Sequence, residues 1–189
     1  MDLGITERVA ALLSAVCEMI EHDIAPLDRE YHAEVGKHPS GNRFAMTDRQ
    51  LEIIDGLKAL ARKRNLWNFW LTGSDRGYGL STVEYAYLAE EMGKVPLAAE
   101  VFNCSAPATG NMEVLERYGT QAHKDRWLGD LLAGQIRSAY VMTEPGLASS
   151  DAAQLAFEAR RDGNDFISVS YTHLRAHETG RNLVCRRML

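Results

Sequence analysis

The chain has 189 residues, of which 46% are apolar and 25% charged, and its formal net charge is -5 at pH 7. This is the composition of a soluble globular protein, and no apolar run approaches the roughly 20 residues that cross a bilayer. The acidic balance disfavours nucleic acid as a partner, because phosphate binding needs a concentrated basic surface.

The N-terminus and the cysteines indicate a reducing compartment. Met1 to Glu7 carry acidic side chains where a secretory signal has basic ones, and no small-residue cleavage site follows the apolar stretch that ends at Ile20. Cys17, Cys104 and Cys185 lie far apart, with no spacing that suits a disulfide framework or a zinc site. We therefore expect a cytoplasmic protein with buried, reduced cysteines and no metal.

Two amphipathic helices are predicted in the first third of the chain. The apolar residues of the first recur at three-and-four spacing, and Pro26 is expected to end or redirect that helix. These residues are Val9, Leu12, Leu13, Val16 and Ile20. Thr47 stands in capping-box spacing to Gln50 and opens the second helix, whose last turn carries the basic residues 62–64. The predicted apolar face of the second helix consists of Leu51, Ile54, Leu57 and Leu60.

Four further helical segments are predicted before residue 135. Residues 66–71, Leu-Trp-Asn-Phe-Trp-Leu, form an aromatic cluster that we interpret as core rather than as a ligand surface. Ser81 with Glu84 forms a second capping box, and Thr120 is expected to cap the last helix. The four helices are predicted over residues 81–93, 96–102, 106–118 and 120–134.

From Ile136 the sequence changes from helical to β patterning. Asp162-Gly163-Asn164-Asp165 is a predicted hairpin turn. The predicted strands cover residues 138–143, 155–160 and 166–170. We therefore predict a mainly α fold, in which a helical domain over residues 1–135 is followed by the start of a β domain over residues 136–168.

The stretch from Tyr140 to Asp151 carries the candidate chemistry. It reads as a strand that runs into a loop of small and hydroxyl-bearing residues. Strand-end backbone groups, the hydroxyl of Thr143 and the low bulk of residues 146–150 suit a large flat ligand or a pyrophosphate. An ordinary strand-to-loop exit, with Ser149 or Asp151 capping the next element, fits the same spacing, because such loops are common turn formers.

Several ordered motifs resemble the acyl-CoA dehydrogenase family over about residues 6–168. Tyr-Val-Met-Thr-Glu-Pro at residues 140–145, followed by Ala-Ser-Ser-Asp at residues 148–151, resembles the flavin-binding signature of that family. The Ala-Ser-Ser-Asp form is similar to the branch of family members ten and eleven. Further stretches similar to that branch are residues 66–70, 77–80, 88–93 and, most specific of all, 101–113.

The resemblance implies a flavoenzyme in which a helical N-terminal domain, a middle β domain and a C-terminal helical domain enclose FAD. The implied flavin contacts are Tyr140, Val141, Met142, Thr143, Ser149 and Ser150. Thr143 is implied to hydrogen-bond the isoalloxazine edge, and Ser150, with Ser149 as the alternative, to approach the thioester of the acyl-CoA substrate. The implied reaction is α,β-desaturation to 2-enoyl-CoA, in which a glutamate removes the α-proton and the β-hydrogen passes as hydride to the flavin. Electron-transfer flavoprotein or a similar acceptor is the implied redox partner, and the parent enzyme is implied to be a homo-oligomer.

Other candidate residues are set aside. Glu144 lies beside the implied flavin, but the base of the family comes from the C-terminal domain, so we assign Glu144 a turn or salt-bridge role. His173 and His177 with Glu178 do not have the order of a zincin motif, in which the glutamate lies between the histidines.

Residues 102–111 are expected to line the acyl pocket of the intact enzyme.

The resemblance stops at about residue 169. The Asn-Gly turn and Lys-Trp-Trp-like strand expected of the family are missing, and residues 171–189 hold four arginines against Glu178 alone. We hypothesise that residues 169–189 are a non-native or out-of-frame tail. The chain then lacks most of the β domain, the C-terminal domain and the catalytic glutamate. We therefore expect no catalytic residue in it, no tight hold on FAD and no activity alone.

The sequence is compatible with two other functions. One is a helical interaction module whose loop at residues 140–151 binds a partner instead of a flavin. The other is a related flavin oxidase or monooxygenase on the same fold, which differs mainly in a base that lies outside this chain.

Overall fold

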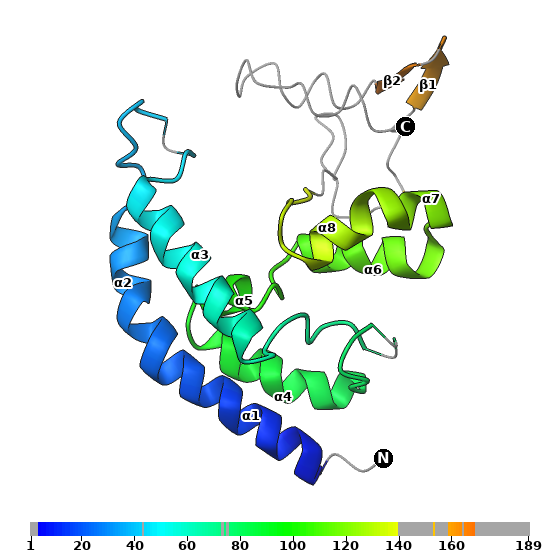
Figure 1. Cartoon of the computed structure of the whole chain (residues 1–189). Helices are drawn as coiled ribbons and strands as arrows, with labels where there is room; N and C mark the ends of the chain where they lie inside the picture. Colours follow the sequence, from blue (N-terminus) through cyan, green and yellow to red (C-terminus); the bar gives the residue numbers. More distant parts are fainter. Residues whose placement is uncertain are drawn as a thin grey trace. The chain divides into compact units, whose positions relative to one another are not determined.

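The computed structural model describes residues 4–42, 44–72, 74, 76–139, 153, 159–163 and 165–168. The chain divides into two compact units, Met1–Ala139 and Tyr140–Leu189. The described part of the first unit is helical, and the described part of the second contains a β-hairpin (Figure 1). The prediction of a mainly α fold is confirmed.

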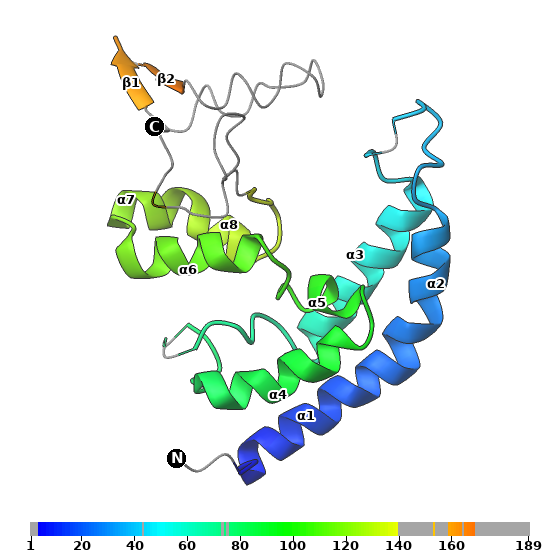
Figure 2. The same cartoon turned by 180° about the vertical axis from the view of Figure 1, so that it is seen from behind.

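Six continuous helical segments make up the described part of the first unit, as predicted. The first runs without a break through α1 (Glu7–Met19), the π-helical turn η1 (Ile20–Ile24) and α2 (Ala25–Ala33). The next four are α3 (Asp48–Lys63), α4 (Thr82–Gly93), α5 (Ala98–Val101) and α6 (Ala108–Tyr118). The last consists of α7 (Gln121–His123), η2 (Lys124–Leu128) and α8 (Gly129–Leu132). α1 packs against α4, α2 against α3, and α6 against η2 and α8 (Figure 1 and Figure 2).

The first helix continues past Pro26, so the expectation that this proline ends it is wrong. The N–H of Ala25 bonds the carbonyl of Ile20, which is the wider spacing of a π-turn. Pro26 then lies at the start of α2, directly after this π-turn, so the missing N–H of the proline falls where the helical hydrogen-bond spacing changes. The predicted apolar face is confirmed: Val9, Val16 and Ile20 are buried, and Leu12 and Leu13 pack against the same core.

α3 begins at the predicted capping box. The N–H of Gln50 donates to the Thr47 hydroxyl at 3.2 Å, and the N–H of Thr47 donates to the Gln50 side chain at 3.0 Å. Ile54 and Leu57 are buried as predicted, but Leu51 is 42% exposed. Gln50 takes the buried position in the first turn because its amide also donates to the carbonyl of Tyr31 at 3.3 Å.

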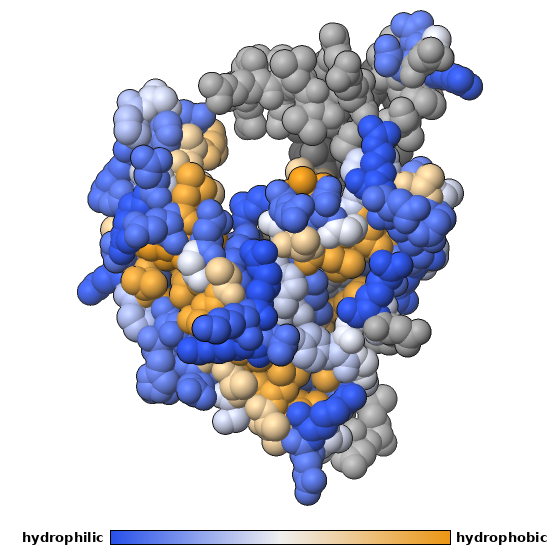
Figure 3. Space-filling view, viewed as in Figure 1, coloured by the Kyte–Doolittle hydropathy of each residue, from blue (hydrophilic) through white to orange (hydrophobic). Residues whose placement is uncertain are grey.

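The aromatic cluster lies in the core, as interpreted from the sequence. Phe69 is fully buried and its ring centroid lies 5.6 Å from that of Phe102, while Trp70 is 7% exposed. The predicted capping box of Ser81 and Glu84 is also present and opens α4. On the face shown in Figure 3, apolar side chains form small patches between hydrophilic ones.

The hairpin of the second unit closes at the predicted turn. β1 (Ala159–Asp162) pairs antiparallel with β2 (Asp165–Ser168), and Asp162 lies opposite Asp165. Gly163 has φ +61°, a value that two-residue hairpin turns require and that glycine adopts without strain. Both strands therefore reach the turn itself, whereas the predicted strands stop short of it. Most of the predicted strand at residues 138–143 lies outside the described residues, and Ser138 and Ala139 are not in a strand.

Candidate functional site

The residues with the implied flavin contacts lie outside the described part of the chain. This holds for Tyr140, Val141, Met142, Thr143, Ser149 and Ser150, and equally for Glu144, His173 and His177. The structure does describe the three residues that lead directly into them, Arg137 to Ala139. We call these three residues the junction, and they form the candidate site.

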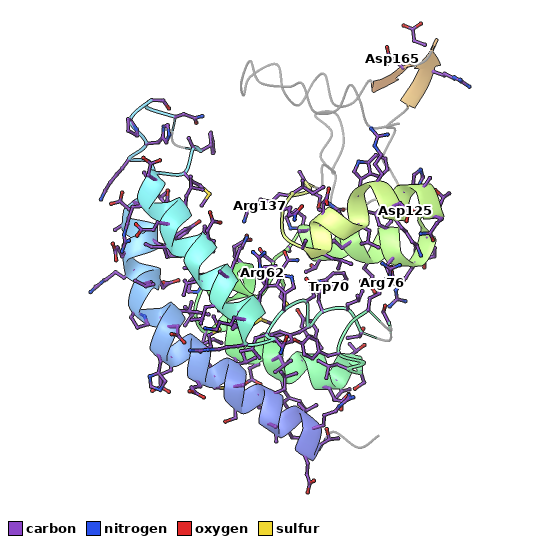
Figure 4. All side chains as sticks on the ribbon, in the orientation of Figure 1. Arg62, Trp70, Arg76, Asp125, Arg137 and Asp165 are labelled. Carbon is purple, nitrogen blue, oxygen red and sulfur yellow. The ribbon has the colours of Figure 1, made fainter. Side chains whose placement is uncertain are left out.

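The first junction residue is held by a buried ion pair between α3 and α5. Lys58 Nζ lies 2.5 Å from Glu100 Oε1, and the two side chains are 10% and 22% exposed. Arg137 contacts the same carboxylate oxygen from the segment that follows α8 (Figure 4). Burial raises the pKa of Glu100, but the hydrogen bonds and charges of Lys58 and Arg137 outweigh it and hold that pKa below its usual value. Glu100 is thus an ionised group that ties α3, α5 and the junction together.

The other two junction residues are held by one side chain of α6. Asn111 Nδ2 donates to the Ser138 hydroxyl at 3.0 Å and to the Ala139 carbonyl at 3.2 Å. A primary amide nitrogen carries two N–H groups, so both bonds can form together. Asn111 therefore contacts the backbone at the last residue before Tyr140.

The end of α8, just before the junction, is held by side chains from two earlier loops. The carbonyl of Leu132 accepts from Trp67 Nε1 at 2.7 Å and from Asn68 Nδ2 at 2.9 Å, and Asn103 Nδ2 donates to the carbonyl of Leu131 at 3.1 Å. The Leu131 carbonyl also accepts from the N–H of Gly134 at 3.0 Å, and the Leu132 carbonyl, at the last residue of the helix, accepts from side-chain donors. Asn68 and Asn103 have φ values of +61° and +55°, in the left-handed region that asparagine tolerates better than most residues.

Gly134 completes this contact. Its φ is +69°, and a Cβ at this position would lie 2.9 Å from Trp67 Cζ2. Trp67 in turn lies under the guanidinium of Arg62, whose Cζ is 4.6 Å from the ring centroid. The chain therefore passes over the indole ring at close range between α8 and the junction.

A separate cavity of about 600 Å³ lies between the loop after Trp70 and the second half of α6. Its charged residues pair with one another: Arg76 with Glu116 at 3.5 Å and Arg117 with Glu113 at 2.7 Å. Because these charges cancel, the cavity has no excess of either sign with which to attract an ion. We therefore regard the junction, not this cavity, as the candidate site.

Two cysteines, Cys17 and Cys104, lie in the part of the chain that the structure describes. Cys104 is buried, and burial raises its pKa to about 12, so its thiol stays protonated near neutral pH. Cys17 is only partly buried, which corrects the expectation for that residue. Among the described residues no group of three potential metal ligands comes together, and no helix is long and apolar enough to cross a bilayer.

The described residues of the first unit thus form a helical domain that ends at the junction. The model of the family described as acyl-CoA dehydrogenase, N-terminal domain, matches residues 6–135. The chain therefore belongs to the acyl-CoA dehydrogenase family.

Relatives and solved structures agree with this assignment. The chain is 40% identical over 169 residues to acyl-CoA dehydrogenase family member 10 of Mus musculus, covering 87% of this chain and 15% of the relative. It is 39% identical over 165 residues to family member 11 of Rattus norvegicus, covering 86% of this chain and 20% of the relative. The chain thus spans a fifth or less of the length of these relatives.

Two solved structures have the same fold. A structure from Mycobacterium abscessus, whose name places it among the acyl-CoA dehydrogenases, has a TM-score of 0.74 at 44% identity and covers 87% of this chain and 41% of its own. The acyl-CoA dehydrogenase of Geobacillus kaustophilus has a TM-score of 0.59 at 20% identity over 87% of this chain and 38% of its own. The second likeness concerns the fold alone.

Sequence reasoning did not find the junction contacts. Asn111 lies in the most specific family-like stretch, but it was assigned to an acyl pocket, a role that stays a prediction. The sequence held one hint that Lys58 and Glu100 are buried. Lys58 follows the buried Leu57 of α3, and Glu100 precedes the buried Val101 of α5. Their pairing over 42 positions of sequence leaves no local pattern.

Proposed function

We propose that the chain is the N-terminal part of an FAD-dependent acyl-CoA dehydrogenase, which in its intact form converts acyl-CoA thioesters to 2-enoyl-CoA. The observation that carries the proposal is the family match over residues 6–135, because it ends just before the flavin-like signature at residues 140–151. The intact enzyme would pass its electrons to electron-transfer flavoprotein or a similar acceptor.

The residues after the junction have the chemistry that a flavin requires. Backbone groups of residues 140–143 and the hydroxyls of Thr143, Ser149 and Ser150 would bind the cofactor and orient it toward the thioester. FAD, when bound, supplies the acceptor for the hydride. The role that we propose for this chain is to bind and orient. We assign it no proton-transfer residue, because the base of the family comes from its C-terminal domain, which the resemblance over residues 6–168 does not reach.

The proposal includes the domain limits and the tail. Residues 1–135 would form the N-terminal domain, residues 136–168 the start of the β domain, and residues 169–189 a non-native or out-of-frame tail. Sequencing the source locus tests the tail: we expect a downstream dehydrogenase reading frame that joins at about residue 169. A single continuous frame through residues 169–189 with no such frame downstream would contradict this part.

Activity is tested with residues 1–168 joined to the downstream frame. We expect purified protein with visible flavin absorbance, and acyl-CoA-dependent reduction of an electron acceptor. The 189-residue chain is the matched comparison and should neither retain flavin nor reduce the acceptor. A joined protein that folds but holds no flavin would refute the proposal. Oxidation of another substrate class without acyl-CoA turnover would favour the related flavin oxidase or monooxygenase.

A helical interaction module is the second candidate, and one observation favours it. α6 exposes Val114 and Tyr118, which are 57% and 80% exposed and lie four residues apart on the same side of the helix. Exposed apolar side chains that lie side by side mark contact surfaces more often than isolated ones do. Flavin retention by the joined protein separates the two candidates.

A further inference from the structure

Two residues that line the cavity beside α6 each carry a buried polar atom with no hydrogen-bond partner. These atoms are Trp70 Nε1 and Glu116 Oε2, and we call them the orphan pair. Trp70 is 7% exposed and lies on the loop between α3 and α4, where Figure 4 labels it together with Arg76. The side chain of Glu116, on α6, is 17% exposed. Within the described part of the chain, no other buried side-chain nitrogen or oxygen lacks a partner.

The remaining charged groups of the cavity are paired. Glu116 Oε1 accepts from the Ser74 hydroxyl at 3.1 Å and lies 3.5 Å from Arg76 Nε, while Arg117 pairs with Glu113 at 2.7 Å. The orphan pair is covered by protein atoms, so solvent does not satisfy it. A buried polar group without a partner costs free energy, which a hydrogen bond from a ligand would offset. The orphan pair therefore marks two positions at which a ligand gains a hydrogen bond.

The orphan pair selects one class of ligand. An indole N–H can only donate, and an ionised carboxylate oxygen can only accept. An amine would match Glu116 but leave Trp70 without a partner, and a carboxylate would match Trp70 but meet the negative charge of Glu116. A hydroxyl or a primary amide both accepts and donates, so one such group can serve both atoms. Because the two ion pairs of the cavity cancel, a neutral ligand also suits its charge.

The size and lining of the cavity suit a small molecule with an apolar body. Its volume is about 600 Å³, and small-molecule sites have volumes of roughly 300–1,000 Å³. Trp70 and Leu71 give the lining apolar surface, and Thr72 and Ser74 add hydroxyls. A ligand reaches the orphan pair through small rotations of Trp70 and Glu116, since other atoms of both side chains already line the cavity.

We propose that this cavity is a binding site for a neutral small molecule that carries a hydroxyl or primary amide group on an apolar body, held by Trp70 and Glu116. The site is separate from the junction and goes beyond the proposed function, because it uses no junction residue and no implied flavin contact. Its test therefore needs neither flavin nor acyl-CoA.

The first test follows the indole N–H signals of the 189-residue chain by NMR during titration with four compounds that share one ring. These are cyclohexanol, cyclohexanecarboxamide, cyclohexylammonium and cyclohexanecarboxylate. We expect the alcohol and the amide to shift the Trp70 signal saturably, and to bind about tenfold more tightly than the two charged compounds, which is what one lost hydrogen bond allows. The Trp67 signal is the internal control, because Trp67 Nε1 already donates to the carbonyl of Leu132 at 2.7 Å. Trp70→Phe identifies the Trp70 signal by its loss.

The second test compares two glutamates of the same helix. In Glu116→Gln the amide oxygen can stay with Ser74 and Arg76, which puts a donor in the place of the orphan acceptor. We expect this variant to bind cyclohexanol about tenfold more weakly. Glu113→Gln is the matched control, because Glu113 lines the same cavity and also pairs with an arginine but has no orphan oxygen. Its affinity should stay within about twofold of that of the unsubstituted chain.

Each part of the proposal has a result that would overturn it. A Trp70 signal that shows no saturable shift with any of the four compounds would overturn the site. Equal or tighter binding of the charged compounds would overturn the ligand class, and an equal loss in Glu113→Gln and Glu116→Gln would overturn the role of Glu116. Should Trp70→Phe fail to fold, the four titrations and the two glutamate variants still decide.

Discussion

Removal of one member of the Lys58–Glu100 pair measures how strongly it ties α3 to α5. Lys58→Met takes away the ammonium 2.5 Å from Glu100 Oε1, in a pair whose side chains are only 10% and 22% exposed. Breaking a fully buried pair in this way costs about 3–5 kcal/mol. Arg137 remains beside the carboxylate and Glu100 keeps some contact with water, so we expect a loss of about 2–3 kcal/mol in the free energy of unfolding.

A double substitution separates charge from packing. Lys58→Met together with Glu100→Leu replaces the pair by apolar side chains, and should unfold within about 1 kcal/mol of the unsubstituted chain. Lys37→Met is the surface control, since Lys37 pairs with Glu34 at 3.0 Å but is 59% exposed. Its cost should stay below about 0.5 kcal/mol.

The assay is urea unfolding of the 189-residue chain, followed by far-UV circular dichroism, for the four members of the double-mutant cycle and the control. The coupling energy is the sum of the two single costs minus the cost of the double substitution, so it should be at least about 2 kcal/mol, far above that of distant sites. A cost for Lys58→Met no larger than that for Lys37→Met, with no coupling to Glu100, would refute the reasoning.

Further substitutions test the junction and the caps. The lowered pKa of Glu100 means that its ionised form contributes stability above the ordinary carboxyl pKa of about 4.3, and that this contribution is lost as the pH falls through the lowered value. Glu100→Gln should therefore destabilise most near pH 7 and least in acid, which a series of urea curves against pH would show. Gly134→Ala should lower the free energy of unfolding by about 1–2 kcal/mol because its φ is +69°, and by a further amount because the new Cβ meets Trp67. Gly41→Ala is the control: its φ is +72° with open space around it, so it should show the backbone cost alone. Thermal unfolding of the two variants makes the comparison. Thr47→Ala should cost about 1 kcal/mol by loss of the α3 cap, measured by the same method. Cys104 should resist alkylation in the folded chain and react after unfolding, as peptide mapping by mass spectrometry would reveal, since its pKa is about 12 and it is buried.

Local patterns account for the part of the fold that could be predicted from sequence. The capping boxes at Thr47 and Ser81 and the turn at Gly163 each depend on residues within three positions of one another, so their spacing is visible in the chain. The aromatic core residues were predictable because a run of large apolar side chains has few other places to lie.

The misses at Leu51 and Asn111 have non-local causes. Leu51 was assigned to the buried face of α3, but Gln50 takes that place through a bond to Tyr31, 19 residues away. The miss at Pro26 is local: this proline was expected to end or redirect the helix, and it does not end it, because the helix continues through a π-turn just before it. Asn111 meets Ser138 across 27 residues, so no periodicity marks the pair. The flavin contacts came from family resemblance, lie outside the described residues and stay predictions.

The cap on α8 has a consequence for synthesis. Trp67, Asn68 and Asn103 all precede the carbonyls that they bind, and Lys58, Glu100 and Asn111 precede the junction. When α8 leaves the ribosome, each of its partners has therefore already been translated. Domains generally fold from the N-terminus during synthesis. The helical unit can thus complete its contacts up to Ala139 while the segment that begins at Tyr140 is still emerging.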